Sequence, residues 1–320
     1  MAVSGLRLGL RLTVAAKAEI ADQLFGFRLV AADGGELPAF TPGAHLSIET
    51  PAGIVNKYSI ASSPSDRGGY DVVIQREPEG EGGSTSMADE VQPGRVLAAS
   101  MPDNAFEFLP GAAQYLFVAG GIGITPIHSM VRHMVESGMD NFKLYYLTRD
   151  EACTAYRDEF QAEPFRQHVV IHHSRPGTGR FDLWPVFEKP RKAMIYCCGP
   201  RGLMESVRDM TGHWSRSAVK FERFGVDRAT RREDRAFDVT LARSGWEIHV
   251  PANSTLLEAL RNNGVAVRSS CESGTCGTCM TPLVSGDVDH RDMCLEDDER
   301  EHQIMVCVSR ARSGRLVLDL

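Results

Sequence analysis

The sequence has no run of eighteen or more apolar residues, so we expect no helix that spans a membrane. No apolar segment follows the N-terminal letters MAVSGLR, and a secretory signal is therefore not expected either. Positive charge is also scarce: 35 Lys and Arg against 42 Asp and Glu give a net charge of −7, which argues against nucleic acid as a partner. These absences favour a cytoplasmic protein, and 320 residues are enough for two or three domains.

Four of the eight cysteines follow a spacing that is typical of metal sites. The letters CESGTCGTC at 271–279 place Cys271, Cys276 and Cys279 on a C-x4-C-x2-C loop, and Cys307 follows later. This is the ligand spacing of a plant-type [2Fe–2S] cluster, whose two irons need four thiolates. A zinc site is the alternative, but zinc motifs usually pair two short C-x2-C elements, and the chain has only one here. The spacing predicts a protein that transfers single electrons.

Changes in residue pattern along the sequence predict three domains, at 1–107, 108–226 and 236–320, with a solvated, charged linker at 227–235. The first domain has short alternating strands punctuated by Gly and Pro, which favours a closed antiparallel β-barrel; a β-sandwich has the same periodicity. We expect its strands at 8–14, 25–31, 45–50, 56–61, 70–76 and 96–100, and a short helix at 87–91.

The second domain alternates strands with helices, which predicts a parallel sheet flanked by helices. Its strands are expected at 115–119, 142–147, 169–172, 193–197 and 219–222. The third domain is expected to open with a hairpin, 237–242 and 246–250, and a helix at 255–262 that Ser254 and Glu258 begin.

The letters GGIGITP at 120–126 are a second strong signal, because a strand, a glycine-rich turn and a helix N-terminus together make an anion site. The loop differs from the Rossmann G-x-G-x-x-G pattern, and alone it is also compatible with a simple tight turn. The letters YCCGP at 196–200 end a later strand. Both loops are therefore expected at the carboxyl edge of the sheet, where open parallel sheets bind ligands.

Two segments of the first domain are weaker signals when taken singly. In NKYS at 56–59 the tyrosine could cover an aromatic ring system, and in GEGGSTS at 80–86 hydroxyls and backbone N–H groups could hold a phosphate. A strand tyrosine is more often packing, and Gly-Gly-Ser is more often a loop.

Taken in order, these motifs resemble the phthalate dioxygenase reductase family, the FMN, NADH and [2Fe–2S] electron-transfer components of Rieske-type oxygenase systems. The resemblance spans all three predicted domains and is closest at 145–150, 196–214 and 269–320. It implies an antiparallel β-barrel flavin domain, a parallel-sheet nucleotide-binding domain and a C-terminal β-grasp ferredoxin domain. It also implies electron transfer from NADH through FMN to the cluster and on to an oxygenase component, with a phthalate-like substrate system.

The resemblance assigns roles to matching positions. Cys271, Cys276, Cys279 and Cys307 would bind the cluster. Thr125, Cys198 and Phe224 would lie beside the reacting rings. The implied flavin-binding residues are Asn56, Lys57, Tyr58, Ser59, Val73, Ile74, Gln75, Gly82, Gly83, Ser84 and Thr85, and the implied nicotinamide dinucleotide-binding residues are Gly121, Gly123, Arg149, Asp150, Gly199 and Pro200.

One position departs from the family, whose members carry Arg-x-Tyr-Ser where this chain has Asn56-Lys57-Tyr58-Ser59. Arginine offers a forked, permanently charged contact to phosphate that asparagine cannot replace. Lys57 or Arg76 would have to supply the charge, although Lys57 is expected on the opposite face of the strand. We therefore expect weaker or rearranged phosphate binding, with FAD in place of FMN as the open alternative.

NADH is favoured over NADPH by Asp150, because a carboxylate after the second strand of the sheet accepts ribose hydroxyls and repels a 2′-phosphate; Arg149 keeps NADPH open. The electron relay needs no acid–base pair, so His128, His133, His172 and His173 are expected to be structural or surface residues. Two other functions remain open. One is a stand-alone diaphorase or ferric reductase with a small-molecule acceptor, and the other is an interaction protein with a zinc-filled cysteine module.

Overall fold

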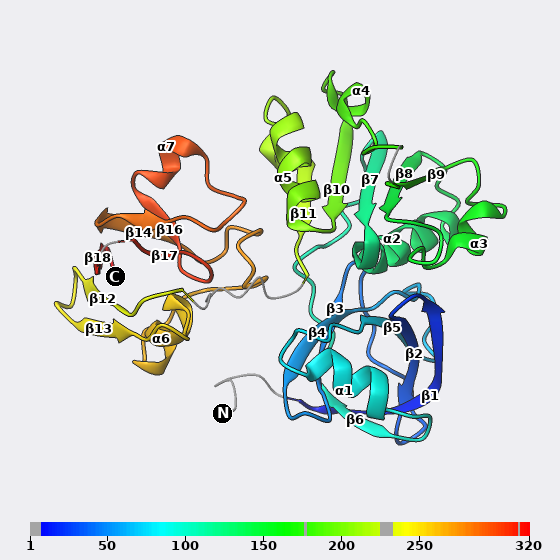
Figure 1. Cartoon of the computed structure of the whole chain (residues 1–320), viewed down its shortest axis with the longest axis horizontal. Coiled ribbons are helices and arrows are strands. Elements are labelled where there is room, and N and C mark those ends of the chain that lie inside the picture. The colour runs from blue at the N-terminus through cyan, green and yellow to red at the C-terminus, as the bar shows by residue number, and fades with distance from the viewer. Residues whose placement is uncertain (1–7, 176–177, 225–232, 313) are drawn as a thin grey trace. The chain divides into compact units, whose positions relative to one another are not determined.

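The computed structural model describes residues 8–175, 178–224, 233–312 and 314–320 (Figure 1). The chain divides into two compact units, Met1–Phe221 and Glu222–Leu320. The domain boundaries expected at 107 and 226 stay predictions, since the first unit holds both of the first two sheets. Among the described residues, no helix has the length and apolar character needed to cross a membrane.

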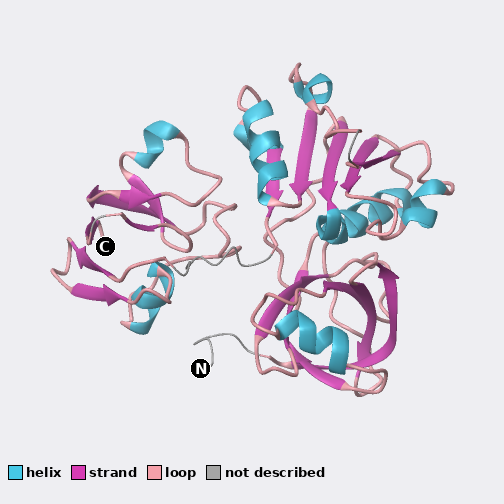
Figure 2. Cartoon of the chain, viewed as in Figure 1, coloured by secondary structure: helices cyan, strands magenta, loops and turns pink. Residues whose placement is uncertain are grey.

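The first sheet is antiparallel and has six strands in the order β4-β3-β6-β1-β2-β5. Its edge strands meet at one end through a bridge between Ile60 and Val72, so the sheet curls into a barrel, which confirms the predicted architecture (Figure 2). Alternate apolar side chains of the strands fill its interior, since β residues two apart share a face. The elements are β1 (Leu10–Ala21), β2 (Leu24–Ala31), β3 (His45–Glu49), β4 (Val55–Ser59), β5 (Tyr70–Gln75), α1 (Gly83–Glu90) and β6 (Val96–Ala99).

Two elements of the barrel differ from the prediction. Strand β1 continues to Ala21 instead of ending at 14, because its second half pairs with β2 through bulges and carries small and polar residues that hide the alternation. Helix α1 begins at Gly83 instead of 87. Its N-cap, Gly82, has a φ of 92°, a conformation that glycine adopts at no steric cost.

The second sheet has the order β11-β10-β7-β8-β9, and its β10-β7, β7-β8 and β8-β9 pairs are parallel, as expected. Strand β7 is central and almost wholly buried, which explains its continuous apolar sequence. The chain order reverses between β7 and β10, which makes their carboxyl ends a topological switch point. The elements are β7 (Gln114–Gly120), η1 (Gly121–Gly123), α2 (Ile124–Glu136), β8 (Phe142–Thr148), α3 (Arg157–Gln161), β9 (Val169–His173), α4 (Trp184–Phe187), β10 (Ala193–Cys198), α5 (Arg201–Met210), η2 (Arg216–Ala218) and β11 (Val219–Glu222).

The second unit has a sheet with the strand order β13-β12-β18-β14-β16 and a small β15-β17 pair. The expected hairpin forms between β12 and β13. Thr255, not Ser254, caps helix α6, in a capping box with Glu258. The elements are β12 (Phe237–Leu241), β13 (Glu247–Val250), α6 (Leu256–Asn262), β14 (Met280–Ser285), β15 (Val288–Asp289), α7 (Asp297–Arg300), β16 (Gln303–Met305), β17 (Arg310–Ala311) and β18 (Arg315–Leu318).

The linker expected at 227–235 lies outside the described residues from 227 to 232, and its described end is not solvated as predicted. The side chain of Asp234 is only 5% exposed and lies 2.6 Å from Arg291 Nη2 and 3.4 Å from Arg310 Nε. A carboxylate can be buried in this way because two guanidinium groups compensate its charge. Composition alone could not show these partners, which come from far along the chain.

Candidate functional site

Strand β4 presents the predicted flavin residues on alternate faces. Asn56 Nδ2 donates to the Tyr58 hydroxyl at 3.2 Å, so these two side chains share one face, and burial raises the pKa of Tyr58. Ser59 is 3% exposed, and its Oγ has no hydrogen-bond partner among the described residues. Lys57 is exposed on the other face, as expected. A buried hydroxyl with an unmet hydrogen bond fits a ligand with polar ring atoms.

The glycine–serine segment supplies the N-terminus of α1 next to this strand. A Cβ on Gly83 would lie 2.6 Å from Asn56 Nδ2, so the Asn56 amide reaches the first turn of the helix. Ser84 Oγ accepts from Glu77 N, and Thr85 Oγ1 donates to the Glu77 carbonyl, both at 3.2 Å. No acidic residue lies in this first turn, whose backbone N–H groups and dipole favour an anion.

Arg76 is not available as a simple replacement for the family arginine. Its Nε and Nη2 each lie 2.9 Å from a carboxylate oxygen of Asp89 in a forked ion pair. This pair raises the pKa of Arg76 and lowers that of Asp89. The charge of Arg76 is therefore already compensated within the barrel.

The third predicted flavin element is β5, where Val73, Ile74 and Gln75 pair with β2. In the sheet order β5 is an edge strand, joined to β4 only through the bridge at Ile60 and Val72. The outer backbone edge of 73–75 is consequently suited to line a bound ring.

The two loops at the switch point interlock through their glycines. A Cβ on Gly123 would lie 2.2 Å from the Cys198 carbonyl oxygen, and one on Gly120 would lie 2.6 Å from Pro200 Cδ. A Cβ on Gly199 would likewise lie 2.9 Å from the Cα of Gly120. These three glycines allow backbone to pack on backbone. Gly121, with a φ of 52° and nothing within 4 Å of its Cβ position, is the open member of the loop.

Two of the predicted ring-contacting residues lie at this switch point. Thr125 is 2% exposed in the first turn of α2, where its Oγ1 donates to the Ile122 carbonyl at 3.1 Å, and Cys198 is fully buried at the end of β10. Phe224 is half-buried and belongs to the second unit, so its role beside Thr125 stays a prediction.

Asp150 follows β8 at the same edge of the sheet. Its Oδ1 accepts from Cys153 N at 3.0 Å, and this bond is the main reason that the pKa of Asp150 lies below its ordinary value. The carboxylate is therefore ionised at neutral pH, although part of its accepting capacity stabilises its own turn. Arg149 is exposed.

The cysteine loop of the second unit is shaped by left-handed residues: Gly274 has a φ of 76°, Gly277 of 79° and Glu272 of 56°. Arg261, at the end of α6, binds Glu272 at 2.9 Å and also donates to Ser269, which ties the start of the loop to the helix. Sequence reasoning missed this contact. The signal for it was a basic residue in the last turn of a helix just before the loop.

The four predicted cluster thiols form two pairs. A hydrogen bond from Cys276 lowers the pKa of Cys271, and one from Cys307 lowers the pKa of Cys279. Across the described ranges, no three or more His, Cys, Asp or Glu side chains gather into a single metal-binding group. The charge of Cys271 acts on both Cys279 and Cys307, so the two pairs lie within electrostatic reach of each other, and four thiols are the donor set that two bridged irons need. The residues present therefore fit a [2Fe–2S] cluster.

Comparison with known proteins identifies the domains of the chain. Family models match at residues 11–108 (oxidoreductase FAD-binding domain), 117–209 (oxidoreductase NAD-binding domain) and 239–312 (2Fe-2S iron-sulfur cluster binding domain). The chain is 51% identical to a phthalate 4,5-dioxygenase oxygenase reductase subunit of Pseudomonas putida, over 97% of this chain and 96% of that relative. It is 48% identical to a phthalate dioxygenase reductase of Burkholderia cepacia, over 97% of each chain.

Among solved structures, a phthalate dioxygenase reductase described as a modular structure for electron transfer from pyridine nucleotides to [2Fe-2S] superposes with a TM-score of 0.75. The two sequences are 47% identical, and the superposition covers 97% of this chain and 98% of the solved structure. The chain is therefore an oxidoreductase with flavin, NAD and [2Fe–2S] domains, and it belongs to the phthalate dioxygenase reductase family.

Proposed function

We propose that this protein is the reductase component of a Rieske-type aromatic-ring oxygenase system, with a phthalate-like substrate, and acts in the cytoplasm. A flavin held at Tyr58 and Ser59 would supply the conversion of an electron pair into single electrons, which a [2Fe–2S] centre held by the four cysteines would require. The observation that carries the proposal is the two pairs of thiols at Cys271, Cys276, Cys279 and Cys307. A hydride-to-dye enzyme has no need of such a module, and iron-ligating thiols suit a reducing compartment.

We propose FMN as the flavin, held over Tyr58 and Ser59, along the backbone of β5, with its phosphate at the N-terminus of α1. The unpaired Ser59 hydroxyl and the Asn56 amide beside Gly83 support this placement. Mass analysis of the released flavin distinguishes FMN from FAD.

The charge lost at Asn56 is tested by flavin affinity in Asn56→Arg and Lys57→Ala. We expect Asn56→Arg to tighten binding, because a guanidinium adds a charged, forked contact to phosphate. Lys57→Ala should weaken binding only if the lysine bends round from its exposed face. Unchanged affinity in both variants would refute the idea that charge at this strand controls phosphate binding.

We propose NADH as the donor, bound at the switch point framed by Gly121, Gly123, Cys198 and the turn Gly199–Pro200, with Thr125 beside the nicotinamide. Asp150 would accept the adenosine ribose hydroxyls and repel a 2′-phosphate. The test is kcat/KM for NADH and NADPH in the wild type and in Asp150→Asn. A wild-type preference for NADPH would contradict the assignment, and so would an unchanged preference in the variant.

The cluster module distinguishes an oxygenase reductase from a diaphorase or ferric reductase. Cys271→Ser should abolish electron delivery to a Rieske-type oxygenase while NADH-dependent reduction of ferricyanide, which the flavin can perform directly, continues. The control is the visible spectrum, in which the flavin bands should persist and the iron–sulfur bands should be lost. If Cys271→Ser lost oxygenase reduction and ferricyanide reduction equally while it kept its flavin, the proposed division of work between flavin and cluster would be wrong.

A further inference from the structure

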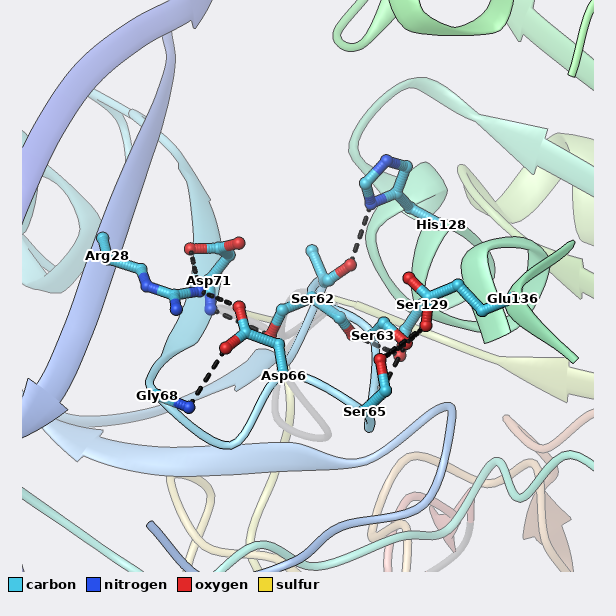
Figure 3. A network of polar contacts seen from close by, with 11 residues as sticks. Arg28, Ser62, Ser63, Ser65, Asp66, Gly68, Asp71, His128, Ser129 and Glu136 are labelled. Carbon is cyan, nitrogen blue, oxygen red and sulfur yellow. Dashed lines mark hydrogen bonds and ion pairs between the residues drawn. The ribbon is translucent and has the colours of Figure 1, made fainter. Parts of the chain in front are cut away.

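Helix α2 presents buried polar side chains to the barrel segment that directly follows the flavin strand β4. His128 is 2% exposed and Ser129 is fully buried. His128 Nδ1 lies 2.8 Å from the Ala61 carbonyl oxygen, and Ser129 Oγ donates to the Ser62 carbonyl at 2.8 Å (Figure 3). The helix that begins at the switch point is thus bonded to the flavin barrel one turn after Thr125.

The same face of α2 makes a further contact two turns later. Ser63 Oγ and Ser65 Oγ both donate to Glu136 Oε2, the second at 2.6 Å. We call this set of contacts between α2 and segment 61–65 the seam. Because it spans almost the whole length of the helix, it fixes the direction of α2 as well as its position.

Segment 61–65 is bonded to the flavin-lining strand β5 on its other side. Ala61 N donates to the Asp71 carbonyl at 2.7 Å, and Asp71 N donates to Ser62 Oγ at 3.1 Å. Ile60 forms the bridge to Val72 just before Val73. One short stretch of backbone therefore joins both flavin-lining strands to the helix that carries the nicotinamide loop.

Each ring nitrogen of His128 lies within hydrogen-bond distance of an oxygen atom: Nδ1 contacts the Ala61 carbonyl oxygen and Nε2 contacts a carboxylate. The Ala61 carbonyl can only accept, and Nε2 lies 3.0 Å from Glu159 Oε2 of α3. Burial opposes ionisation of Glu159, but the hydrogen bond and charge of His128, with the charge of Arg132, outweigh it and lower the pKa of Glu159. The ring therefore bridges the barrel segment at Ala61 and helix α3 at Glu159. The ring also stacks on Tyr156 at 3.8 Å.

We propose that His128 is a positioning residue for hydride transfer, which through its bond to Ala61 holds the nicotinamide loop at a fixed distance from the flavin strands. The inference rests on the proposed function, since it requires NADH and flavin to meet at these elements. A displacement of about 1 Å costs about 100-fold in such a step, so the stiffness of the seam has a direct effect on rate.

Two substitutions at one position separate the two bonds. His128→Asn places an amide NH2 near the Nδ1 position and keeps a donor for Ala61, whereas His128→Gln places one near Nε2 and keeps only the donor for Glu159. Flavin reduction by NADH is followed in an anaerobic stopped-flow experiment with the full-length holoprotein. We expect about a 10- to 100-fold slower reduction in His128→Gln and a change within about threefold in His128→Asn.

Three readouts separate positioning from general damage. The affinity for NADH and the electron transfer from dithionite-reduced flavin to the cluster should each stay near the wild-type value in both variants. The melting temperature should fall more in His128→Asn, which leaves Glu159 without its histidine partner, than in His128→Gln, so stability and hydride transfer should rank the two variants in opposite orders. Ser129→Ala, which removes the adjacent seam bond, should also slow flavin reduction. His213→Gln is the matched control, because His213 is exposed, with one hydrogen bond to the Glu188 carbonyl and one ring contact to Trp184.

Equal flavin reduction in His128→Gln, His128→Asn and the wild type would overturn the inference. A parallel loss of hydride transfer, NADH affinity and cluster reduction would overturn it as well, since that pattern means only structural support. A wild-type protein whose flavin NADH does not reduce would instead refute the proposed function itself.

Discussion

Substituting Gly123 by alanine should force apart the two loops that meet at the switch point. The added Cβ would lie 2.2 Å from the Cys198 carbonyl oxygen, 2.4 Å from its carbonyl carbon and 2.7 Å from Gly199 N. Ordinary contacts between such atoms are about 3.5 Å, so the loops must separate by about 1 Å. All three atoms are backbone and cannot turn away as a side chain would. We therefore expect the upper part of the usual overpacking cost, about 3 kcal/mol, and about a 100-fold loss in kcat/KM for NADH.

Two other glycines provide controls for this clash. Gly121→Ala meets open space, and its cost should come only from the left-handed φ of 52°, about 1–2 kcal/mol. Gly202→Ala also meets open space, within helix α5, and should stabilise the protein by up to about 1 kcal/mol. Urea unfolding of the first unit, followed by the release of flavin fluorescence, gives the three free energies in one assay.

The result that refutes this reasoning is a Gly123→Ala protein with wild-type stability and a raised Kd for NADH. That outcome would mean that the glycine serves the close approach of a pyrophosphate, as the sequence motif alone suggested. Loss of stability together with loss of NADH turnover supports the packing role instead. The backbone of Gly123 has an ordinary φ of −61°, so conformational strain cannot account for such a loss.

Further predictions follow from the ion pairs. Arg76→Gln should change flavin affinity by less than about twofold, measured by fluorescence titration, because the guanidinium already binds a carboxylate. Asp234→Asn should destabilise the second unit by about 3–5 kcal/mol in urea unfolding, since buried Arg310 loses the carboxylate that it contacts and Arg291 keeps only Asp289. Because the pKa of Glu159 is lowered in the folded protein, its carboxylate stabilises the fold at pH values above 4.5, its ordinary pKa. This stabilisation is lost as the pH falls through the lower pKa of the folded state. Glu159→Gln should therefore flatten the melting temperature against pH on the acid side; an unchanged acid slope would contradict this.

The sequence was sufficient to predict an element wherever its residue pattern is compatible with only one structure. The apolar run of β7 predicts a buried parallel strand because both of its faces are covered, and the C-x4-C-x2-C loop predicts a cluster because few other donor sets use that spacing. Helix α1 was placed four residues too late because glycine, serine and threonine have low helix propensity, while its actual start depends on the left-handed Gly82.

The sequence was insufficient wherever partners come from distant segments. Asp234 looked like part of a solvated linker, yet Arg291 and Arg310 bury it. His128 was expected to be structural or on the surface, and only its contact with Ala61, 67 positions away, shows that it joins helix α2 to the barrel segment after β4. No local pattern encodes such a contact, because neither side chain nor carbonyl carries a signature of its partner.

Hydrogen bonding in the stretch from Ser59 to Ser65 separates the part that we propose to face the flavin from the part that holds α2. Ser62 and Ser63 are buried with their hydroxyls bonded, the first to Asp71 N and the second to Glu136. Ser59 is equally buried, but its hydroxyl has no partner among the described residues. A buried unmet hydroxyl costs about 1–3 kcal/mol, which a ligand that pairs with it recovers on binding. The unmet hydroxyl of Ser59 therefore supports the proposed ligand side of this stretch, and the satisfied hydroxyls belong to the side that holds helix α2.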